Sequence, residues 1–283
     1  LDTIMAKAKF PRREIEKSIS LDEKNLEKIS LFGTTVESLS KEEIELEIPA
    51  NRPDLMSTQG FIRSFLAFQG KRTGMKKYKI SSKERYNVKV DKSVKSVRPF
   101  TACAVIKNLS LNNEKLKEII NLQEKLHSTI GRNRKKCAIG IYPLDKITFP
   151  IKYEARKPES VKFTPLGEQK EMDALQILQK NQKGKEYAHL LKKNDKYPIF
   201  IDAKNNIMSM PPIINSAYIG EVTEKTKDIF IECSGRDRKT LDKVITIIST
   251  SLADMGGTIN QVSVSDEGQH NYPNLNSEKI KIE

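Results

Sequence analysis

A short proline segment places two polar side chains where they could do chemistry. The stretch NNIMSMPPIINS covers residues 205–216, with Ser209 before its two adjacent prolines and Asn215 after them. Neither proline has a backbone N–H to donate to a helix or a sheet, and the residue before a proline is restricted to extended geometry. The sequence therefore predicts a stiff, extended apolar segment without backbone pairing, which holds a hydroxyl and an amide near its ends.

The other reactive residues match no familiar catalytic or metal-binding pattern. The cysteines and histidines are far apart in the chain: Cys103, Cys137, Cys233, His127, His189 and His270. None has CxxC or HExxH spacing, and the chain has no P-loop, no GxGxxG after a strand and no GxSxG turn. No disulfide framework, zinc site or other metal site is expected. The cysteine usage fits a reducing cytoplasm.

The charge of the chain favours an anionic partner. The 283 residues carry a formal net charge of +13, with basic runs at 70–77, 131–136 and 235–239. Nucleic acid is the first candidate partner, and a solvated lysine-rich surface is the alternative. Tryptophan is absent and aromatic residues are few, so base-stacking surfaces are not obvious. No apolar run is long enough to span a bilayer.

The elements that must position these residues begin with a small α+β module over residues 1–90. Apolar and acidic residues alternate in EIELEI, which is typical of a half-buried strand. One helix is predicted over residues 22–30, and a second one starts at a cap on Ser57 or Thr58. Residues 70–97 predict a basic connection with room for one strand.

A larger unit follows, and its second strand presents small residues. Strands are predicted in FTACAVIKNL and KCAIGIY, with a helix capped by Asn112 or Asn113 between them. In the second strand Ala138, Gly140 and Tyr142 share one face. Such small residues leave room for another group to approach the backbone, either a packed helix or a ligand.

The rest of this unit mixes strands and helices. Strands are predicted in FPIKYEARKP, YPIFID, DIFIECSG and INQVSVS, and short helices after Asp173 and in GKEYAHLL. A long amphipathic helix capped by Asp237 ends at a glycine pair. Interspersed elements of this kind predict an α+β class with a mixed or antiparallel sheet and packed helices. The expected larger domain spans residues 91–265, and residues 266–283 read as a linker.

Nine segments occur in an order that resembles a known family. They are IPANRPDL, RPFTACAVIKNL, LQEKLH, KCAIGIYPLD, VKFTPLGEQKEM, KGKEYAHLL, YPIFID, MSMPPIIN and DIFIECSG. Together they resemble the N-terminal half of the phenylalanyl-tRNA synthetase β subunit, in its archaeal and eukaryotic-cytosolic form, over roughly residues 20–270.

The resemblance implies a function for each unit. The first would be a structural module (B1-like), and the second the B3/B4 editing domain. In the family, this domain uses a positioned water to hydrolyse the ester of tyrosine that is wrongly attached to the phenylalanine tRNA. The resemblance also implies tRNA and an α subunit as partners in an α2β2 enzyme, with ATP and Mg used by the full enzyme and no cofactor in this part. The chain stops before the family's later domains and is expected to be a fragment. The alternative is a tRNA-binding scaffold that has lost editing.

The resemblance places the substrate-selecting group on the strand DIFIECSG. The family has an acidic residue where this chain has Glu232, beside Phe230 on the same strand face. An acceptor at the end of an apolar slot can hydrogen-bond the tyrosine hydroxyl, and such a site rejects phenylalanine by as much as about 10⁴–10⁵. The alternative is a surface glutamate on an edge strand.

The resemblance also gives the opening segment a role. Met210, Pro211 and Pro212 would form an apolar pocket wall. Ser209 and Asn215 would bind the aminoacyl-adenosine end or the hydrolytic water, since the matching residues are implicated in editing. The alternatives are a turn residue bonded to its own backbone for Asn215 and a satisfied loop hydroxyl for Ser209.

Further residues receive weaker assignments. Glu124 is a candidate substrate contact, together with the small residues Ala138 and Gly140, and the alternative for Glu124 is a structural polar residue. Arg132 and Arg134 are candidates for binding tRNA phosphates or the terminal adenosine, with plain solvation as the alternative.

One local departure from the family concerns the site itself. Most relatives have His-Asp where this chain has Tyr142 and Pro143, so the detail of the site is expected to differ. His127 and His189 are expected to be structural.

Overall fold

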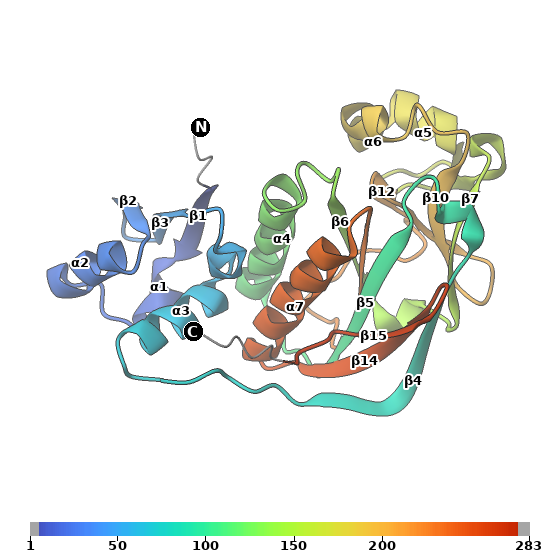
Figure 1. Cartoon of the computed structure of the whole chain (residues 1–283). Helices are drawn as coiled ribbons and strands as arrows, with labels where there is room; N and C mark the ends of the chain where they lie inside the picture. The colour runs from blue at the N-terminus through green and yellow to red at the C-terminus, as the bar shows by residue number, and fades with distance from the viewer. Residues whose placement is uncertain (1–5, 277–283) are drawn as a thin grey trace, which may run out of the picture.

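The computed structural model describes residues 6–276, which form two units of different size (Figure 1). The first unit contains β1 (Ala6–Pro11), α1 (Arg12–Glu16), α2 (Glu23–Leu31), β2 (Thr35–Leu39), β3 (Glu43–Ile48), a 3-10 turn (Pro53–Met56) and α3 (Thr58–Phe68). Its strands form an antiparallel sheet in the order β1-β3-β2. The strand expected in EIELEI and both expected helices are confirmed.

Phenylalanines hold the first unit together. Phe61 and Phe65 lie one turn apart on α3 with ring centres 5.6 Å apart, and Phe10 of β1 stacks on Phe61 at 5.7 Å. Helix α3 begins where the Ser57 hydroxyl oxygen accepts the Gly60 N–H at 3.0 Å, which is one of the two caps that the sequence allowed. The apolar face of α3 is thereby fixed over the small sheet.

The second unit is built on a large mixed sheet. Its elements are β4 (Ile80–Val90), β5 (Phe100–Lys107), α4 (Asn113–Ser128), β6 (Cys137–Pro143), β7 (Ile151–Arg156), β8 (Lys162–Phe163), β9 (Met172–Asp173), α5 (Ala174–Lys180), α6 (Gln182–Tyr187), β10 (Tyr197–Ile201), β11 (Ile207–Met210), β12 (Ile214–Asn215), β13 (Ile229–Gly235), α7 (Arg238–Asp254), β14 (Thr258–Ser265) and β15 (Gln269–Tyr272). The strand order is β12-β11-β10-β7-β4-β14-β5-β13-β6, with β15 on β14. Strand β4 is parallel to β14 and β7, and the other neighbours are antiparallel. The α+β class with a mixed sheet is confirmed.

Two expected boundaries differ from the structure. A first unit ending at residue 90 would contain β4, but β4 pairs with β14 and β7 and therefore belongs to the large sheet. Within the expected linker 266–283, residues 269–272 form β15 on β14, and residues 277–283 lie outside the described range. Strand β4 pairs with segments that are distant in the chain, so alternation alone could not place it, whereas β15 forms a hairpin with the preceding strand β14.

Helix α7 covers β5 and β13, and α4 contacts the edge strand β6 (Figure 1). The expected cap of α7 is not formed in the usual way, because the Asp237 carboxylate accepts the Thr240 hydroxyl at 2.6 Å and no backbone N–H. The helix ends before Gly256, whose φ of +106° suits glycine. Over residues 6–276, no helix has the length and apolar character needed to cross a membrane.

Candidate functional site

A cavity of about 270 Å³ lies between helix α4, the edge strand β6 and the hairpin of β11 and β12. Small-molecule sites usually start at about 300 Å³, so the cavity suits a small ligand group. Its polar lining residues are Gln123, Glu124, His127, Arg134, Lys183, Ser209, Asn215, Glu221 and Glu232. Its walls also include Leu116, Ile119, Ile120, Ala138, Ile139, Ile141, Leu166, Pro211, Pro212, Ile213, Ile214 and Val222.

The proline segment forms a hairpin, and the expectation of an extended segment without backbone pairing is wrong. Ser209 pairs with Asn215 across β11 and β12, and the Ile213 N–H donates to the Met210 carbonyl at 2.9 Å to close the turn. Proline lacks a donor, but the residues on either side of the two prolines supply the pairing. The prolines nevertheless form a cavity wall, as expected.

Arg134 clamps this hairpin from the opposite wall. Its guanidinium donates to the carbonyls of Pro212 and Ile213 at 3.3 and 3.1 Å and to Glu124 Oε1 at 3.2 Å. It also lies over the Tyr187 ring, 4.3 Å from the ring centre, and only 5% of the residue is exposed. The expected phosphate contact is therefore wrong for Arg134 in this conformation, as is plain solvation, because the guanidinium is occupied inside the protein.

Helix α4 covers the free edge of β6 with two side chains. The Ile139 N–H donates to His127 Nε2 at 2.7 Å, and Gln123 Nε2 donates to the Ile139 carbonyl at 2.7 Å. Because Nε2 accepts the Ile139 N–H, the ring proton lies on Nδ1, and burial lowers the pKa of His127 in the same sense. Glu124 Oε1 lies 3.5 Å from Nδ1, and His127 together with Arg134 lowers the pKa of Glu124 to about 2. His127 is thus structural, as expected, while the half-exposed Glu124 carboxylate faces the cavity.

Glu232 is the most unusual group of the cavity. Strand β13 lies between β5 and β6, and Glu232 is 2% exposed, so the alternative of a surface glutamate on an edge strand is wrong. Within the described residues, Oε2 is buried and has no hydrogen-bond partner. Burial raises the pKa of Glu232 to about 8, although nearby Arg98 and the Tyr142 hydroxyl act in the opposite direction.

Tyr142 occupies the space above Gly140. A Cβ built on Gly140 would lie 2.2 Å from the Tyr142 hydroxyl and 2.7 Å from Glu232 Oε1. The same hydroxyl lies 3.2 Å from Glu232 Oε1 and 2.9 Å from Ser209 Oγ. The space expected beside this glycine is therefore not occupied by a packed helix and is not left open for a ligand. The side chain of Tyr142, from the same strand, fills it.

The structure collects many of the expected site residues at one cavity and leaves others out. Glu124, Ala138, Ser209, Pro211, Pro212, Asn215 and Glu232 line it. Met210 and Phe230 are buried in the core and Gly140 lies under Tyr142, and these three are not among the described lining residues. Arg132 is exposed.

Sequence reasoning missed the position of the Tyr142 hydroxyl, together with Gln123 and Lys183. The available signal was the spacing of Tyr142 and Gly140, which share one strand face and let a phenol lie over the glycine.

The site can position a water or a small polar group but shows no standard catalytic set. The part of the chain that the structure describes contains no cluster of His, Cys, Asp and Glu that could hold a metal ion. Asn215 is half-buried at the cavity, and no bond from its amide to its own backbone is found between residues 6 and 276, which disfavours the turn-residue alternative. Its amide is available to a ligand.

No protein-family model matches the chain. The phenylalanine–tRNA ligase beta subunit of Thermococcus sibiricus is 43% identical over 214 residues, covering 76% of this chain and 38% of the relative. That of Methanocaldococcus jannaschii is 38% identical over 279 residues, covering 95% and 50%. The chain thus spans half or less of the length of these two relatives.

A solved structure matches over nearly the whole chain. It is the N-terminal fragment of the phenylalanyl-tRNA synthetase beta-subunit from Pyrococcus horikoshii, with a TM-score of 0.90 and 34% identity. The match covers 96% of this chain and 80% of that one. The likeness therefore includes both units and the sheet that carries the cavity.

Proposed function

Since the chain belongs to the phenylalanyl-tRNA synthetase β-subunit family, we propose that the cavity of its larger unit hydrolyses tyrosine wrongly attached to the phenylalanine tRNA. The observation that carries this proposal is the carboxyl group of Glu232, which lines the cavity, is 2% exposed and, within the described residues, leaves Oε2 without a hydrogen-bond partner. An unpaired buried polar atom is costly unless a ligand satisfies it.

This carboxyl group separates tyrosine from phenylalanine by one hydrogen bond. A tyrosine hydroxyl can pair with Oε2, whereas the bare ring edge of phenylalanine leaves the polar atom desolvated and unpaired. The free-energy penalty is about 1–3 kcal/mol, and it is larger when the unpaired group is ionised. This penalty weakens binding of the correct product, Phe-tRNA, which should not be hydrolysed. The apolar walls bind both rings, so the discrimination rests on Glu232.

The hydrolytic step requires few protein groups. An aminoacyl ester is already activated, so a positioned water and a group that stabilises the developing oxyanion are sufficient. Asn215 and Ser209 lie opposite each other on the hairpin, and both line the cavity. Arg134 holds the turn between them through the carbonyls of Pro212 and Ile213, which keeps the Asn215 amide in one place.

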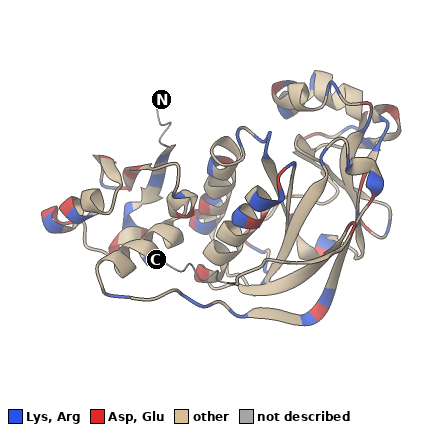
Figure 2. Cartoon of the chain, in the orientation of Figure 1, with Lys and Arg blue, Asp and Glu red and all other residues tan. Residues whose placement is uncertain are grey.

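The partners belong to the same proposal. Lys and Arg residues are spread over both units and over the connection between α3 and β4 (Figure 2), which supports contact with tRNA phosphates along an extended surface. The α subunit of an α2β2 enzyme would perform the ATP-dependent ligation. No ATP-dependent step is assigned to the residues of this chain.

A tRNA-binding scaffold without editing activity is the second candidate. The observation in its favour is the Tyr142 phenol, which fills the space above Gly140 and already contacts both Ser209 and Glu232.

A deacylation assay separates the two candidates. The 283-residue chain is mixed with phenylalanine tRNA that carries either tyrosine (Tyr-tRNA) or phenylalanine (Phe-tRNA), and loss of the ester is followed over time. We expect Tyr-tRNA to be hydrolysed much faster than in buffer and Phe-tRNA to be nearly stable. Hydrolysis of both esters at the buffer rate would contradict editing and favour the scaffold.

A further inference from the structure

We propose that Tyr142 is a positioning residue for substrate selection: its phenol holds Oε1 of Glu232 from behind the cavity wall, so that Oε2 is the atom that reads the substrate hydroxyl. The proposal rests on the editing function proposed above and names the group that makes its selectivity possible. Three strands meet at this contact, since Tyr142 lies on β6, Glu232 on β13 and Ser209 on β11.

Tyr142 lies behind the wall and not in the cavity. Glu232 and Ser209 line the cavity, whereas Tyr142 is fully buried and absent from the described lining residues. Its ring stacks on Phe230 with centres 6.0 Å apart, and Phe230 in turn meets the edge of Phe149 at 5.6 Å. The ring is thus fixed by packing, and its hydroxyl reaches the site from the core side.

The number of hydroxyl hydrogens decides which group donates in each hydrogen bond of Tyr142. The phenol has one hydrogen but two oxygens within reach, Ser209 Oγ at 2.9 Å and Glu232 Oε1 at 3.2 Å. An ionised carboxylate can only accept, so the phenol then donates to Glu232 and the Ser209 hydroxyl donates to the phenol oxygen. Among these three side chains, Oε2 of Glu232 is the one polar atom without a hydrogen-bond partner in the described part of the protein.

The same arrangement serves a protonated Glu232. With Oε1 accepting from Tyr142, the acid proton lies on Oε2 and points away from the phenol. A substrate hydroxyl can then accept from Oε2, whereas it donates to Oε2 when the carboxyl is ionised. Other ionisable groups around Glu232 are Arg98, Cys103 and Tyr153, all buried. A phenylalanine ring can form neither bond.

The alternative is that Tyr142 blocks the site. The substrate phenol would then compete with the Tyr142 phenol for Glu232, and removing the resident hydroxyl would speed hydrolysis. A positioning role predicts the opposite sign. The two readings therefore separate in one experiment.

The experiment compares Tyr142→Phe with Tyr78→Phe in the 283-residue chain. Tyr78 is the matched control because its phenol also contacts a carboxylate, Asp254, at 3.0 Å, and neither residue is among the described lining residues of the cavity. We expect Tyr142→Phe to lower kcat/KM for Tyr-tRNA about tenfold, which corresponds to the loss of one hydrogen bond to the Glu232 carboxyl group. The Phe-tRNA rate should stay unchanged in both variants. A Tyr-tRNA rate in Tyr142→Phe that is unchanged or higher would overturn the proposal.

A binding measurement keeps this test independent of hydrolysis. Amide analogues, 3′-tyrosylamido- and 3′-phenylalanylamido-3′-deoxyadenosine, cannot be hydrolysed, and calorimetry gives their affinities. Wild type should prefer the tyrosyl analogue, and Tyr142→Phe should reduce that preference about tenfold. A preference in wild type without hydrolysis would contradict the proposed function alone. A preference that persists in Tyr142→Phe, or no preference in wild type, would contradict the role of Tyr142.

A second readout reports on the contact itself. The Tyr142 hydroxyl lowers the pKa of Glu232, so its removal should raise that pKa further. Infrared titration of the carboxyl band assigned through Glu232→Gln follows this change. An unchanged pKa of Glu232 in Tyr142→Phe would show that the phenol does not hold Oε1.

Discussion

Two carboxyl groups, Asp254 and Glu232, each accept a hydrogen bond from the hydroxyl of a tyrosine that is distant in the chain, and the rest of their surroundings differ. Asp254 lies at the end of α7, where the two units meet, and Glu232 lies on β13, between β5 and the edge strand β6 of the large sheet. Their partners are Tyr78 and Tyr142. Both contacts join residues far apart in the chain.

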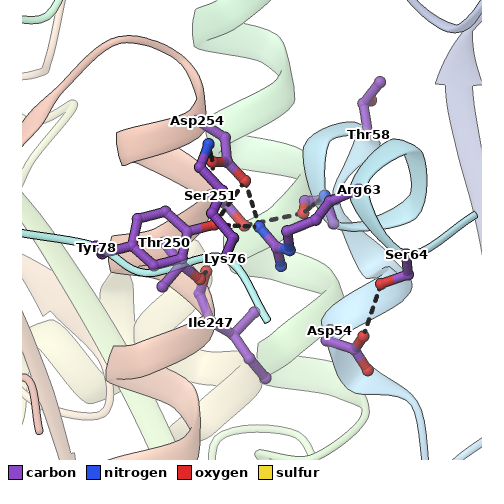
Figure 3. Close-up of polar contacts among 12 residues, drawn as sticks. Asp54, Thr58, Arg63, Ser64, Lys76, Tyr78, Ile247, Thr250, Ser251 and Asp254 are labelled. Carbon is purple, nitrogen blue, oxygen red and sulfur yellow. Dashed lines mark hydrogen bonds and ion pairs between the residues drawn. The ribbon is translucent and has the colours of Figure 1, made fainter. Parts of the chain in front are cut away.

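At the junction the carboxylate is fully paired (Figure 3). Asp254 accepts from Arg63 of α3, from Lys76 at 2.6 Å and from Tyr78 at 3.0 Å, so both oxygens have partners. Nearby, the hydroxyls of Ser57 and Ser251 lie 2.9 Å apart and are buried. Two cations on one carboxylate tie α3 and the connection after it to α7.

In the cavity the carboxyl group is only half paired. Among residues 6–276, Glu232 accepts one hydrogen bond, from Tyr142, accepts none from a cation, and has an unpaired Oε2. The comparison teaches that burial and a phenol alone do not mark a functional acid. The mark is an unsatisfied atom on a side chain that lines a cavity, whereas satisfied atoms mark a structural contact.

The largest expected effect concerns the hairpin opposite Glu232. Asn215→Ala should slow hydrolysis of Tyr-tRNA by about 10²–10³-fold, because one preorganised donor at a developing charge contributes roughly 3–4 kcal/mol to the barrier. Asn260→Ala is the control, since that amide donates to the Thr258 carbonyl away from the cavity. The rates are measured with both esters. Normal editing by Asn215→Ala would return Asn215 to a turn-residue role.

The unpaired state of Glu232 should appear in the pH dependence of stability. Its carboxyl has a pKa of about 8 in the folded chain, against about 4.3 when unfolded. Its contribution is therefore fully present below about pH 4 and is lost as the pH rises through 8, with a slope of at most about 1.4 kcal/mol per unit.

Glu232→Gln removes this titration. Urea unfolding at pH 5, 6, 7 and 8 should show the variant gaining on wild type as the pH rises. A constant difference between the two proteins would contradict the raised pKa of Glu232.

A substitution at the junction of the two units should change the stability of the protein and not its selectivity between Tyr-tRNA and Phe-tRNA. Asp254→Asn leaves Arg63 and Lys76 without their anionic partner and should lower the free energy of unfolding by about 1–3 kcal/mol. Glu267→Gln is the control, because its pair with Lys95 is exposed on both sides. Denaturant unfolding checks the first part. A changed ratio of Tyr-tRNA to Phe-tRNA rates in Asp254→Asn would show that the junction and the cavity are coupled.

The smallest expected effect is on tRNA binding, and it should differ between the neighbouring residues Arg132 and Arg134. Arg132 is exposed, and Arg132→Glu should weaken tRNA binding and reduce the slope of log affinity against log salt by about one. Arg134 is buried against the hairpin, so Arg134→Glu should impair hydrolysis through the hairpin instead. Binding measured between low and moderate salt tests this. A salt slope unaffected by Arg132→Glu would exclude a phosphate contact.

Local patterns were enough to predict most elements, since alternation and caps act over a few residues. The strand around Glu232 and the cap at Ser57 are examples. The pairing of β4 with β14 and β7 was not predictable in this way, because parallel partners are distant in the chain. The hairpin at Pro211 was missed for another reason: proline chemistry excludes donors at two residues but says nothing about the pairing of their neighbours.

The site was predictable in type but not in arrangement. The acidic position of Glu232 followed from the family resemblance, but its burial depends on β13 lying between β5 and β6. The contact of Tyr142 with Ser209 needs β6 and β11 to approach across the fold. The burial of Arg134 likewise depends on the hairpin and on Tyr187.

The most direct test measures deacylation of Tyr-tRNA and Phe-tRNA side by side in wild type, Glu232→Ala, Glu232→Gln and Asp254→Asn. If Glu232 selects the substrate, Glu232→Ala should lose Tyr-tRNA hydrolysis and leave the slow Phe-tRNA reaction untouched. The ratio of the two rates should then collapse, with part of it kept in Glu232→Gln and all of it in Asp254→Asn. A Glu232→Ala protein with the wild-type ratio would contradict the assignment of substrate selection to this carboxyl group.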